Sequence, residues 1–418
     1  MSPAVPVYDF DGNYAGPESV NGSSIYNPVA LTTDMSNTLQ RDRITGNVYA
    51  QITFNKNLNL RSEFGFDDSN NTGKGFKPSY EYGQLKNTDI IIRQQEDHSM
   101  YWIWKNYATY NQSLGKHNFS IMAGNEISKS AWEGIVLQKN NLSSNDIRVI
   151  GVDGTYVPSD RSNAGSTSAS VFGRGTYNYA DRYLLTATLR ADATSKFGSN
   201  NKWGYFPSFA GAWRMSGEEF MSSATDWLSN LKLRAGYGQV GNSNIGTYLY
   251  GSTMRALPTW LGTAYRMANN ANPNLKWEAS EQYNGGVDLG LFNNRIDLTV
   301  DIYYKTTKDL LLQPSVSPVI GGSEWKDIAT PYMNMGKVDN KGIDIALNTH
   351  NIASKNFNWN SNIVFSLNRN EVKALDALGT PIYGKLDWYA AFQTVSMIAV
   401  GQPIGVFYGY KTDGLYKD

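Results

Sequence analysis

A glycine-rich motif is the clearest pattern in the chain whose residues could hold a cofactor. Gly236, Gly238 and Gly241 follow the spacing G-x-G-x-x-G directly after an expected strand at 231–235. In a dinucleotide-binding protein a helix begins at this point, so that its N-terminal amides face the pyrophosphate. The residues that follow here, 242–246, are typical of a loop. We therefore interpret the glycines as the end of a strand, and the sequence predicts no cofactor.

Metal and acid–base chemistry find little support in the pattern of potential ligands. Asp9, Asp11 and Asn13 resemble the start of a calcium loop, but the glycine falls at Gly12, and Val20 occupies the position of the bidentate glutamate. We interpret them as turn residues. No cysteine is present, no sequence feature pairs two carboxylates, and metal-ligand spacing is absent among the three histidines, His98, His117 and His350. The sequence predicts no metal site, no catalytic residues and no enzymatic activity.

Aromatic side chains in the expected loops are the candidate ligand-binding residues. Flat apolar rings beside polar groups suit the stacking of sugars or peptides. The alternative interpretation is packing within loops or a belt of aromatic residues at a membrane surface. The candidates are Trp260, Tyr265, Trp325, Trp388 and Tyr389.

Alternation of apolar and polar residues is the strongest signal for the elements that must position these side chains. From Ile296 to Tyr304 every second residue is apolar or aromatic, and the residues between them include Asp297 and Asp301. This pattern predicts a strand with one apolar and one polar face. The preceding segment, 287–291, continues the pattern, and Asn293 and Asn294 between the two predict a tight turn because they tolerate a left-handed backbone.

About a dozen such strands are expected, joined in pairs by short turns, with long polar connections between most pairs. The 216–229 connection is expected to hold one helical turn. The expected strands are 43–54, 58–67, 99–111, 118–127, 169–179, 183–194, 204–215, 230–239, 280–291, 295–306, 341–350 and 358–368. The long connections are 68–98, 128–168, 240–279, 307–340 and the residues from 369 onward.

This layout distinguishes two classes of all-β protein. Alternating short turns and long loops are typical of transmembrane barrels, and ten residues at about 3.3 Å each, tilted by about 45°, rise about 23 Å, close to the apolar band of such barrels. Arg190 and Asp192 lie on the polar face of one expected strand and suit a water-filled lumen. We predict a partial transmembrane antiparallel β-barrel with long extracellular loops and short periplasmic turns. A soluble sandwich or propeller is the alternative.

Composition excludes several functions. The 418 residues include 37 basic and 37 acidic ones, so no net charge attracts the chain to nucleic acid. Aromatic residues make up 13% and tyrosine contributes 27, a composition that favours strands over helices. No run of about eighteen apolar residues predicts a membrane helix. The first residues lack the basic and apolar segments of a secretory signal.

Several segments resemble the barrel of SusC/RagA-type TonB-linked outer-membrane transporters. Together they span most of the chain from about Arg41 to its end and keep the family's order. The segments are 181–192, 195–198, 203–208, 231–238, 272–278, 334–342 and 403–410.

The resemblance implies a plugged barrel in the outer membrane of a Gram-negative cell that imports oligosaccharides or peptides. It implies a SusD-like surface lipoprotein and the TonB complex as partners, and outer-membrane lipid around the barrel. We expect residues 1–418 to be an internal part of one barrel domain, without the signal peptide, the plug domain or the final strands. A passive porin or surface adhesin is the first alternative, and a soluble carbohydrate-binding β-protein is the second.

Overall fold

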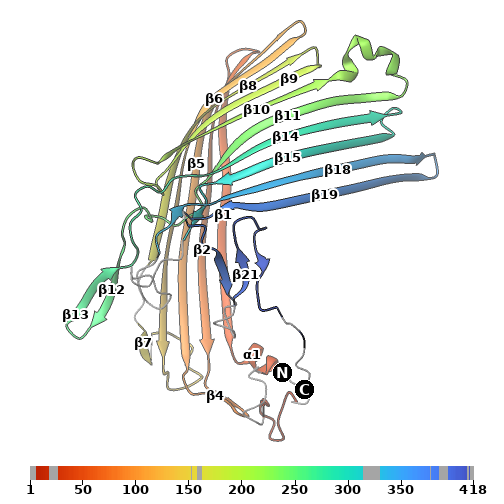
Figure 1. Ribbon diagram of the computed structural model, residues 1–418. Helices are drawn as coiled ribbons and strands as arrows, with labels where there is room; N and C mark the ends of the chain where they lie inside the picture. The colour runs from red at the N-terminus through yellow and green to blue at the C-terminus, as the bar shows by residue number, and fades with distance from the viewer. Residues whose placement is uncertain are drawn as a thin grey trace. The chain divides into compact units, whose positions relative to one another are not determined.

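One antiparallel sheet contains most of the described residues. The computed structural model describes residues 6–17, 27–151, 153–157, 162–313, 330–376, 378–385, 394–411 and 414. Within these ranges the main sheet has 13 strands, twelve of which follow one another in chain order (Figure 1). They are β1 (Ser36–Thr53), β2 (Leu58–Lys77), β5 (Ile91–Leu114), β6 (His117–Asn140), β8 (Ser162–Tyr179), β9 (Tyr183–Thr194), β10 (Trp203–Arg214), β11 (Leu228–Asn242), β14 (Glu278–Leu291), β15 (Ile296–Lys308), β18 (Lys337–Ala353) and β19 (Asn358–Ala374). The all-β prediction and its twelve strands are confirmed.

Smaller elements fill the connections. The remaining strand of the main sheet, β7 (Thr155–Val157), pairs with β6. The other elements are α1 (Pro28–Thr33), β3 (Tyr80–Tyr82), β4 (Leu85–Asn87), η1 (Met215–Gly217), η2 (Glu219–Ala224), β12 (Met254–Thr259), β13 (Gly262–Met267), β16 (Leu311–Leu312), β17 (Met333–Asn334), β20 (Ile382–Lys385), β21 (Thr394–Ile398) and β22 (Val406–Phe407). Among the described residues, no helix has the length and hydropathy needed to cross a membrane.

The chain divides into two compact units, which are described separately. Unit 1 comprises Met1–Val48, Glu63–Trp104 and Ser128–Ser166, and unit 2 comprises Tyr49–Ser62, Lys105–Ile127 and Thr167–Asp418. In unit 1 a small apolar cluster joins Phe76, Ile90, Ile92 and Leu142. The helix α1 begins where Asn27 accepts hydrogen bonds from the backbone of Val29 and Ala30.

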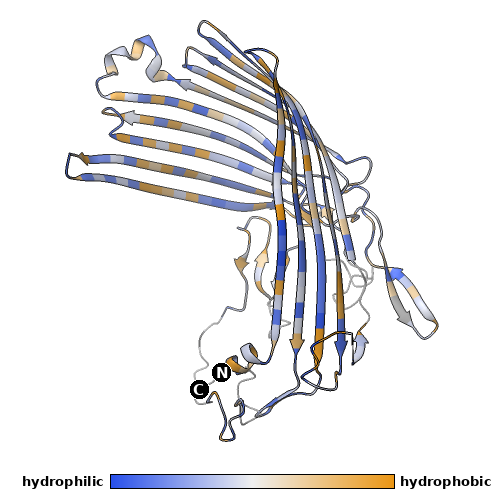
Figure 2. Ribbon diagram, turned by 180° about the vertical axis from the view of Figure 1, so that it is seen from behind, coloured by the Kyte–Doolittle hydropathy of each residue, from blue (hydrophilic) through white to orange (hydrophobic). Residues whose placement is uncertain are grey.

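In unit 2 the pairing of strands places apolar and polar residues on opposite faces of the sheet. Val300 of β15 pairs with Ile345 of β18, which pairs with Phe365 of β19. The next residues along these strands form a polar row, in which Asp301 pairs with Asp344. Side chains alternate sides along a strand, so the two rows face opposite ways. Figure 2 shows the resulting alternation of hydrophobic and hydrophilic residues along the strands.

Tight turns join the strands of each pair. Phe292, Asn293 and Asn294 between β14 and β15 all have positive φ angles, of 52°, 58° and 58°. This left-handed backbone is the conformation that the two asparagines predict. The helical turn expected after β10 is confirmed as the two short 3₁₀ segments η1 and η2.

Several strands extend far beyond the predicted boundaries. β5 and β6 have 24 residues each, and their extensions occupy parts of 68–98 and 128–168, which were wrongly expected to be loop throughout. Most of the β5 extension, from Arg93 to His98, is polar at every position. Ladder hydrogen bonds do not require an apolar face, so the strand continues where the alternating pattern has stopped.

A charged cluster fixes the connection between β10 and β11 to the start of β9. The Glu218 carboxylate accepts hydrogen bonds from the Trp213 indole at 2.9 Å and from Arg182 Nη1 at 2.7 Å. The Glu218 side chain is only 10% exposed. The hydrogen bond from Trp213, a second one from Tyr183 and the charge of Arg182 lower the pKa of Glu218 below its ordinary value of 4.5.

Replacing Glu218 by glutamine is expected to lower the thermal unfolding midpoint at neutral pH and to leave it unchanged in acid. The pKa of Glu218 is lower in the folded state than in the unfolded state. The ionised carboxylate therefore stabilises the fold at pH values above the ordinary pKa of 4.5, and this stabilisation is lost as the pH falls through the folded-state pKa. Midpoints of wild type and E218Q, measured by circular dichroism from about pH 7 to about pH 3, should therefore converge at the acidic end. The neighbouring E219Q variant is the control. A constant difference between wild type and E218Q would contradict the assignment.

Candidate functional site

Two arginine-centred clusters lie on the polar face of unit 2. In the first, Arg234 of β11 contacts Asp288 of β14 through two nitrogens, at 3.0 Å and 2.9 Å, and contacts Asp301 of β15 at 3.0 Å. The three side chains are 27%, 26% and 32% exposed. Gly286 lies opposite Arg234, and a Cβ there would lie 2.8 Å from Arg234 Nη2. The glycine therefore provides the room that the guanidinium occupies.

The second cluster is centred on Arg190 of β9. Arg190 contacts Asp192 at 2.6 Å and Glu126 of β6 at 3.1 Å, and it donates a hydrogen bond to the buried Ser170 hydroxyl at 2.8 Å. Its guanidinium also lies over the Phe172 ring, 5.6 Å from the centroid. The sequence prediction that Arg190 and Asp192 share the polar face is confirmed. Each cluster joins three strands and presents mixed charge and hydrogen-bonding groups to a ligand or a protein segment facing the sheet.

An aromatic cluster anchors the connections at the opposite ends of these strands from the short turns. Phe197 and Leu275 are fully buried, and Trp277 packs edge-on against both Phe197 and Phe206, with ring centroids 5.5 Å and 5.4 Å apart. The Trp277 indole donates a hydrogen bond to the Lys202 carbonyl at 3.0 Å. This cluster holds the bases of the 195–202 and 243–277 connections together.

The glycine motif contributes to this packing. β11 ends at Asn242 and the next elements are strands, so the interpretation of the motif as a strand end is confirmed. A Cβ at Gly241 would lie 2.0 Å from the Phe206 ring, so the ring occupies the space above this glycine. Residue types and spacing had not identified Phe197, Phe206 and Trp277 as neighbours. Their presence in the segments that carry the family resemblance was the one available signal.

The structure describes two of the five predicted ligand-binding aromatic residues. Trp260 lies at the turn of the β12–β13 hairpin and is 92% exposed, and Tyr265 of β13 is 68% exposed. The strand partner of Tyr265 is Ala256. Trp325, Trp388 and Tyr389 lie outside the described residues. The hairpin therefore offers two accessible rings, and their role in binding stays a prediction.

The histidines have ordinary polar partners. His98 contacts Asp68 at 2.8 Å, His117 contacts the Tyr177 hydroxyl at 2.8 Å, and the third, His350, contacts Asn360. No group of three or more histidine, aspartate or glutamate side chains suited to a metal ion occurs in the described part of the chain. At the N-terminal end, Asp9 accepts hydrogen bonds from the amides of Asp11 and Asn13, as expected of a turn.

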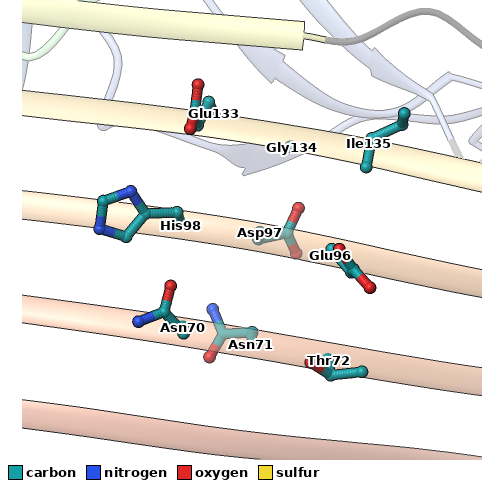
Figure 3. Close-up of a pocket in the computed structure, with 9 residues that line it drawn as sticks. All are labelled: Asn70, Asn71, Thr72, Glu96, Asp97, His98, Glu133, Gly134 and Ile135. Carbon is teal, nitrogen blue, oxygen red and sulfur yellow. The ribbon is translucent and has the colours of Figure 1, made fainter.

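A polar recess of about 340 Å³ lies on the strand extensions of unit 1. Figure 3 shows the lining residues on three adjacent strands, with Asp97 on the middle strand next to Gly134. A Cβ at Gly134 would lie 2.4 Å from Asp97 Oδ1, so the glycine gives the carboxylate its room. Gln95 donates a hydrogen bond to the same carboxylate at 2.6 Å. The lining residues are Asn70, Asn71, Thr72, Glu96, Asp97, His98, Glu133, Gly134 and Ile135. Three carboxylates with amide and hydroxyl groups suit a hydroxyl-rich or cationic ligand.

Comparison with known protein families gives one match across nearly the whole chain. A family model described as "TonB dependent receptor-like, beta-barrel" matches residues 3–413. TonB-dependent receptor P3 of Formosa agariphila is 31% identical over 439 residues, which cover 100% of this chain and 41% of that protein. TonB-dependent receptor SusC of Bacteroides thetaiotaomicron is 29% identical over 379 residues, covering 85% of this chain and 35% of that protein.

A solved structure shows the same fold. The RagAB peptide importer in the "closed-closed" state superposes with a TM-score of 0.83 at 25% identity, and the match covers 96% of this chain and 43% of that chain. The chain thus spans less than half the length of the relatives it matches.

Replacing Arg234 by methionine is expected to destabilise the sheet by about 1–3 kcal/mol, because Asp288 and Asp301 lose their shared cation. Chemical unfolding of the full-length protein in detergent micelles measures this loss. The double variant R234M/D301N should recover part of it, since one unpaired carboxylate is removed. The outcome that contradicts the cluster is equal stability of R234M and wild type.

Proposed function

The chain belongs to the TonB-dependent receptor-like β-barrel family, and we propose that it forms part of the wall of a plugged barrel that imports nutrients. The barrel is an outer-membrane structure of Gram-negative bacteria. The proposal concerns the complete protein, because the chain spans about two fifths of its relatives.

The observation that carries the proposal is the two-faced sheet of unit 2. On the apolar face Ile302 and Phe365 are 59% and 53% exposed, and their neighbours in the same rows are also apolar. Such a surface is unfavourable in water and favourable against lipid. The other face carries the clusters of Arg190 and Arg234, which suit a hydrated interior. A wall of this kind separates a polar path from the hydrocarbon core.

Peptides or oligosaccharides are the substrates that the exposed features of the chain favour. The polar recess offers three carboxylates and several amides, and the β12–β13 hairpin offers the rings of Trp260 and Tyr265. Both features suit large ligands with many hydrogen-bonding groups. The RagAB importer is named as a peptide importer, and we propose peptides as substrates of this protein as well.

We propose two partners for the complete protein. We propose that a SusD-like surface lipoprotein delivers the substrate, and that the TonB complex supplies the energy for import. The described connections offer accessible surface for a lipoprotein lid, including Trp260 and the adjacent Leu261, which is 77% exposed.

Uptake of labelled peptide and oligosaccharide mixtures by cells carrying the full-length gene tests the proposal. Import should fall to the level of a deletion strain when the proton-motive force is dissipated with an uncoupler, or when the TonB complex is inactivated. Uptake that persists in both cases would identify a passive porin, and absence of any uptake above the deletion strain would contradict an import function.

Replacing Trp260 by alanine is expected to weaken substrate binding by about tenfold, or about 1.4 kcal/mol, because a stacking surface is lost. Binding to the purified receptor is measured by calorimetry with the substrate that the uptake assay identifies. The control is Trp227→Ala, which removes a tryptophan that is 49% exposed and lies at the other end of β11 from the hairpin. Equal weakening by both variants would show a general effect on the fold.

A further inference from the structure

A basic row borders the apolar rows of unit 2 at one level across three strands. Tyr304 of β15 pairs with Lys341 of β18, which pairs with Arg369 of β19. These three residues define the basic row. The next three rows toward the short turns are entirely apolar, and they are Ile302–Ile343–Leu367, Val300–Ile345–Phe365 and Leu298–Leu347–Ile363.

The position of the basic row along the strands matches the edge of the membrane. From Ile296 to Tyr304 the chain advances eight residue steps, which rise on the order of 20 Å in a strand tilted as in membrane barrels. An apolar band of such barrels is about 25 Å tall and is flanked by aromatic residues. Tyr304 is the aromatic residue of this level, and it lies at the end of the strand that leads to the long loops.

Lys341 and Arg369 are not neutralised by neighbouring acids. They lie directly opposite each other, and like charges in this relation destabilise a sheet. The carboxylate of Asp339 already accepts hydrogen bonds from Tyr304 at 2.6 Å and from Thr306 at 2.8 Å. Glu371 is paired with Lys373 at 2.7 Å. Among the described residues, the one hydrogen bond of the Arg369 side chain goes to the neighbouring Asn368 carbonyl, and Lys341 forms no ion pair.

The side chains of Lys341 and Arg369 line a recess of about 480 Å³. Its far side is formed by the segment around Gly401, which is held to β19 by two backbone hydrogen bonds with Val372, of 2.8 Å and 2.9 Å. The Ile404 amide also donates to the Asn370 side chain at 2.7 Å. The recess is lined by Tyr304, Asp339, Lys341, Arg369, Asn370, Glu371, Lys373, Gly401 and Pro403. Three cations and two carboxylates give this lining a positive balance.

We propose that the basic row binds the phosphate group of an anionic lipid in the outer leaflet, whose acyl chains lie on the apolar rows. The guanidinium fork of Arg369 and the ammonium group of Lys341 are both suited to phosphate oxygens. A phosphate between them converts a repulsive pair into two attractive contacts. The apolar rows directly below supply the surface for the chains, and the Tyr304 ring suits the boundary between chains and headgroup. The proposal rests on the membrane placement of the sheet and is independent of transport.

The first arm of the test compares the full-length receptor with the variant K341Q/R369Q in a neutral detergent. Because the glutamines remove the like-charge repulsion, the variant should unfold at the same temperature as wild type or higher. Adding phosphatidylglycerol should raise the wild-type midpoint by a few degrees, and it should leave the variant unchanged. A merely structural role for the two side chains would instead lower the variant's midpoint in the neutral detergent.

The second arm counts co-purified phosphorylated lipid by mass spectrometry. Wild type and the charge-conserving variant K341R/R369K should retain at least fivefold more than K341Q/R369Q. The control K56Q/K355Q removes two charges from short turns at the other end of the strands and should retain the wild-type amount. Equal retention by wild type and K341Q/R369Q would overturn the proposal.

Two further additives distinguish the source of the phosphate. Phosphatidylcholine has the same chains without a net negative charge and should stabilise wild type less than phosphatidylglycerol. Inorganic phosphate should give no stabilisation at matched concentration, because it lacks the chains. If inorganic phosphate stabilised wild type as much as phosphatidylglycerol does, the ligand would be a free anion and the lipid assignment would be overturned. The proposed import function would not be affected by this result.

Discussion

The continuous backbone ladder is the constraint on which the rest of the structure depends. In hydrocarbon no water is available to the amide and carbonyl groups, and each unsatisfied group costs several kcal/mol. β15 meets this requirement by pairing along its whole length with β14 on one side and β18 on the other. Pairing also fixes register, because a slip of one residue would exchange Val300 for Asp301 on the lipid-facing side.

The two faces of the sheet constrain their side chains to different degrees. The lipid-facing rows need only apolar bulk, and many side chains satisfy that need equally well. The polar face is more demanding, since Arg234 must reach two aspartates on two other strands, and Gly286 must leave the space. Residues that need a specific side chain therefore lie mainly on the polar face and at the membrane edges, whereas the middle of the apolar face tolerates many apolar substitutions.

The sequence predicted the strands well wherever the membrane dictates their pattern. Close to the short turns, lipid on one side and water on the other impose a period of two, so Ile296–Tyr304 was identifiable from residue type alone. In the β5 extension the residues from Arg93 to His98 are all polar, so the period of two disappears, and the start of β5 was predicted too late in the chain. The β6 extension contains the consecutive apolar residues Ile135, Val136 and Leu137, which also break the alternation, and the end of β6 was predicted too early.

The candidate site was less predictable for a related reason. The exposure of Trp260 and Tyr265 was predictable from residue type and loop position, which are local properties, and their role in binding stays a prediction. The contact of Phe206 with Gly241 and Trp277 depends on the closure of segments more than thirty residues apart, and no local pattern encodes it. The sequence predicted only part of the arginine clusters. Arg190 and Asp192 lie on one strand, so their common face was predictable, whereas the partners of Arg234 lie on two other strands.

The strand extensions have an evolutionary consequence. The polar recess lies on paired strands, whose backbone is held by ladder hydrogen bonds whatever the side chains are. Loops vary in sequence and length more than the elements they connect, but a paired strand keeps its path when Asn70 or Glu133 is substituted. Selection can therefore change the ligand preference of this recess by one substitution at a time. Each substitution leaves the paired backbone of the strands intact.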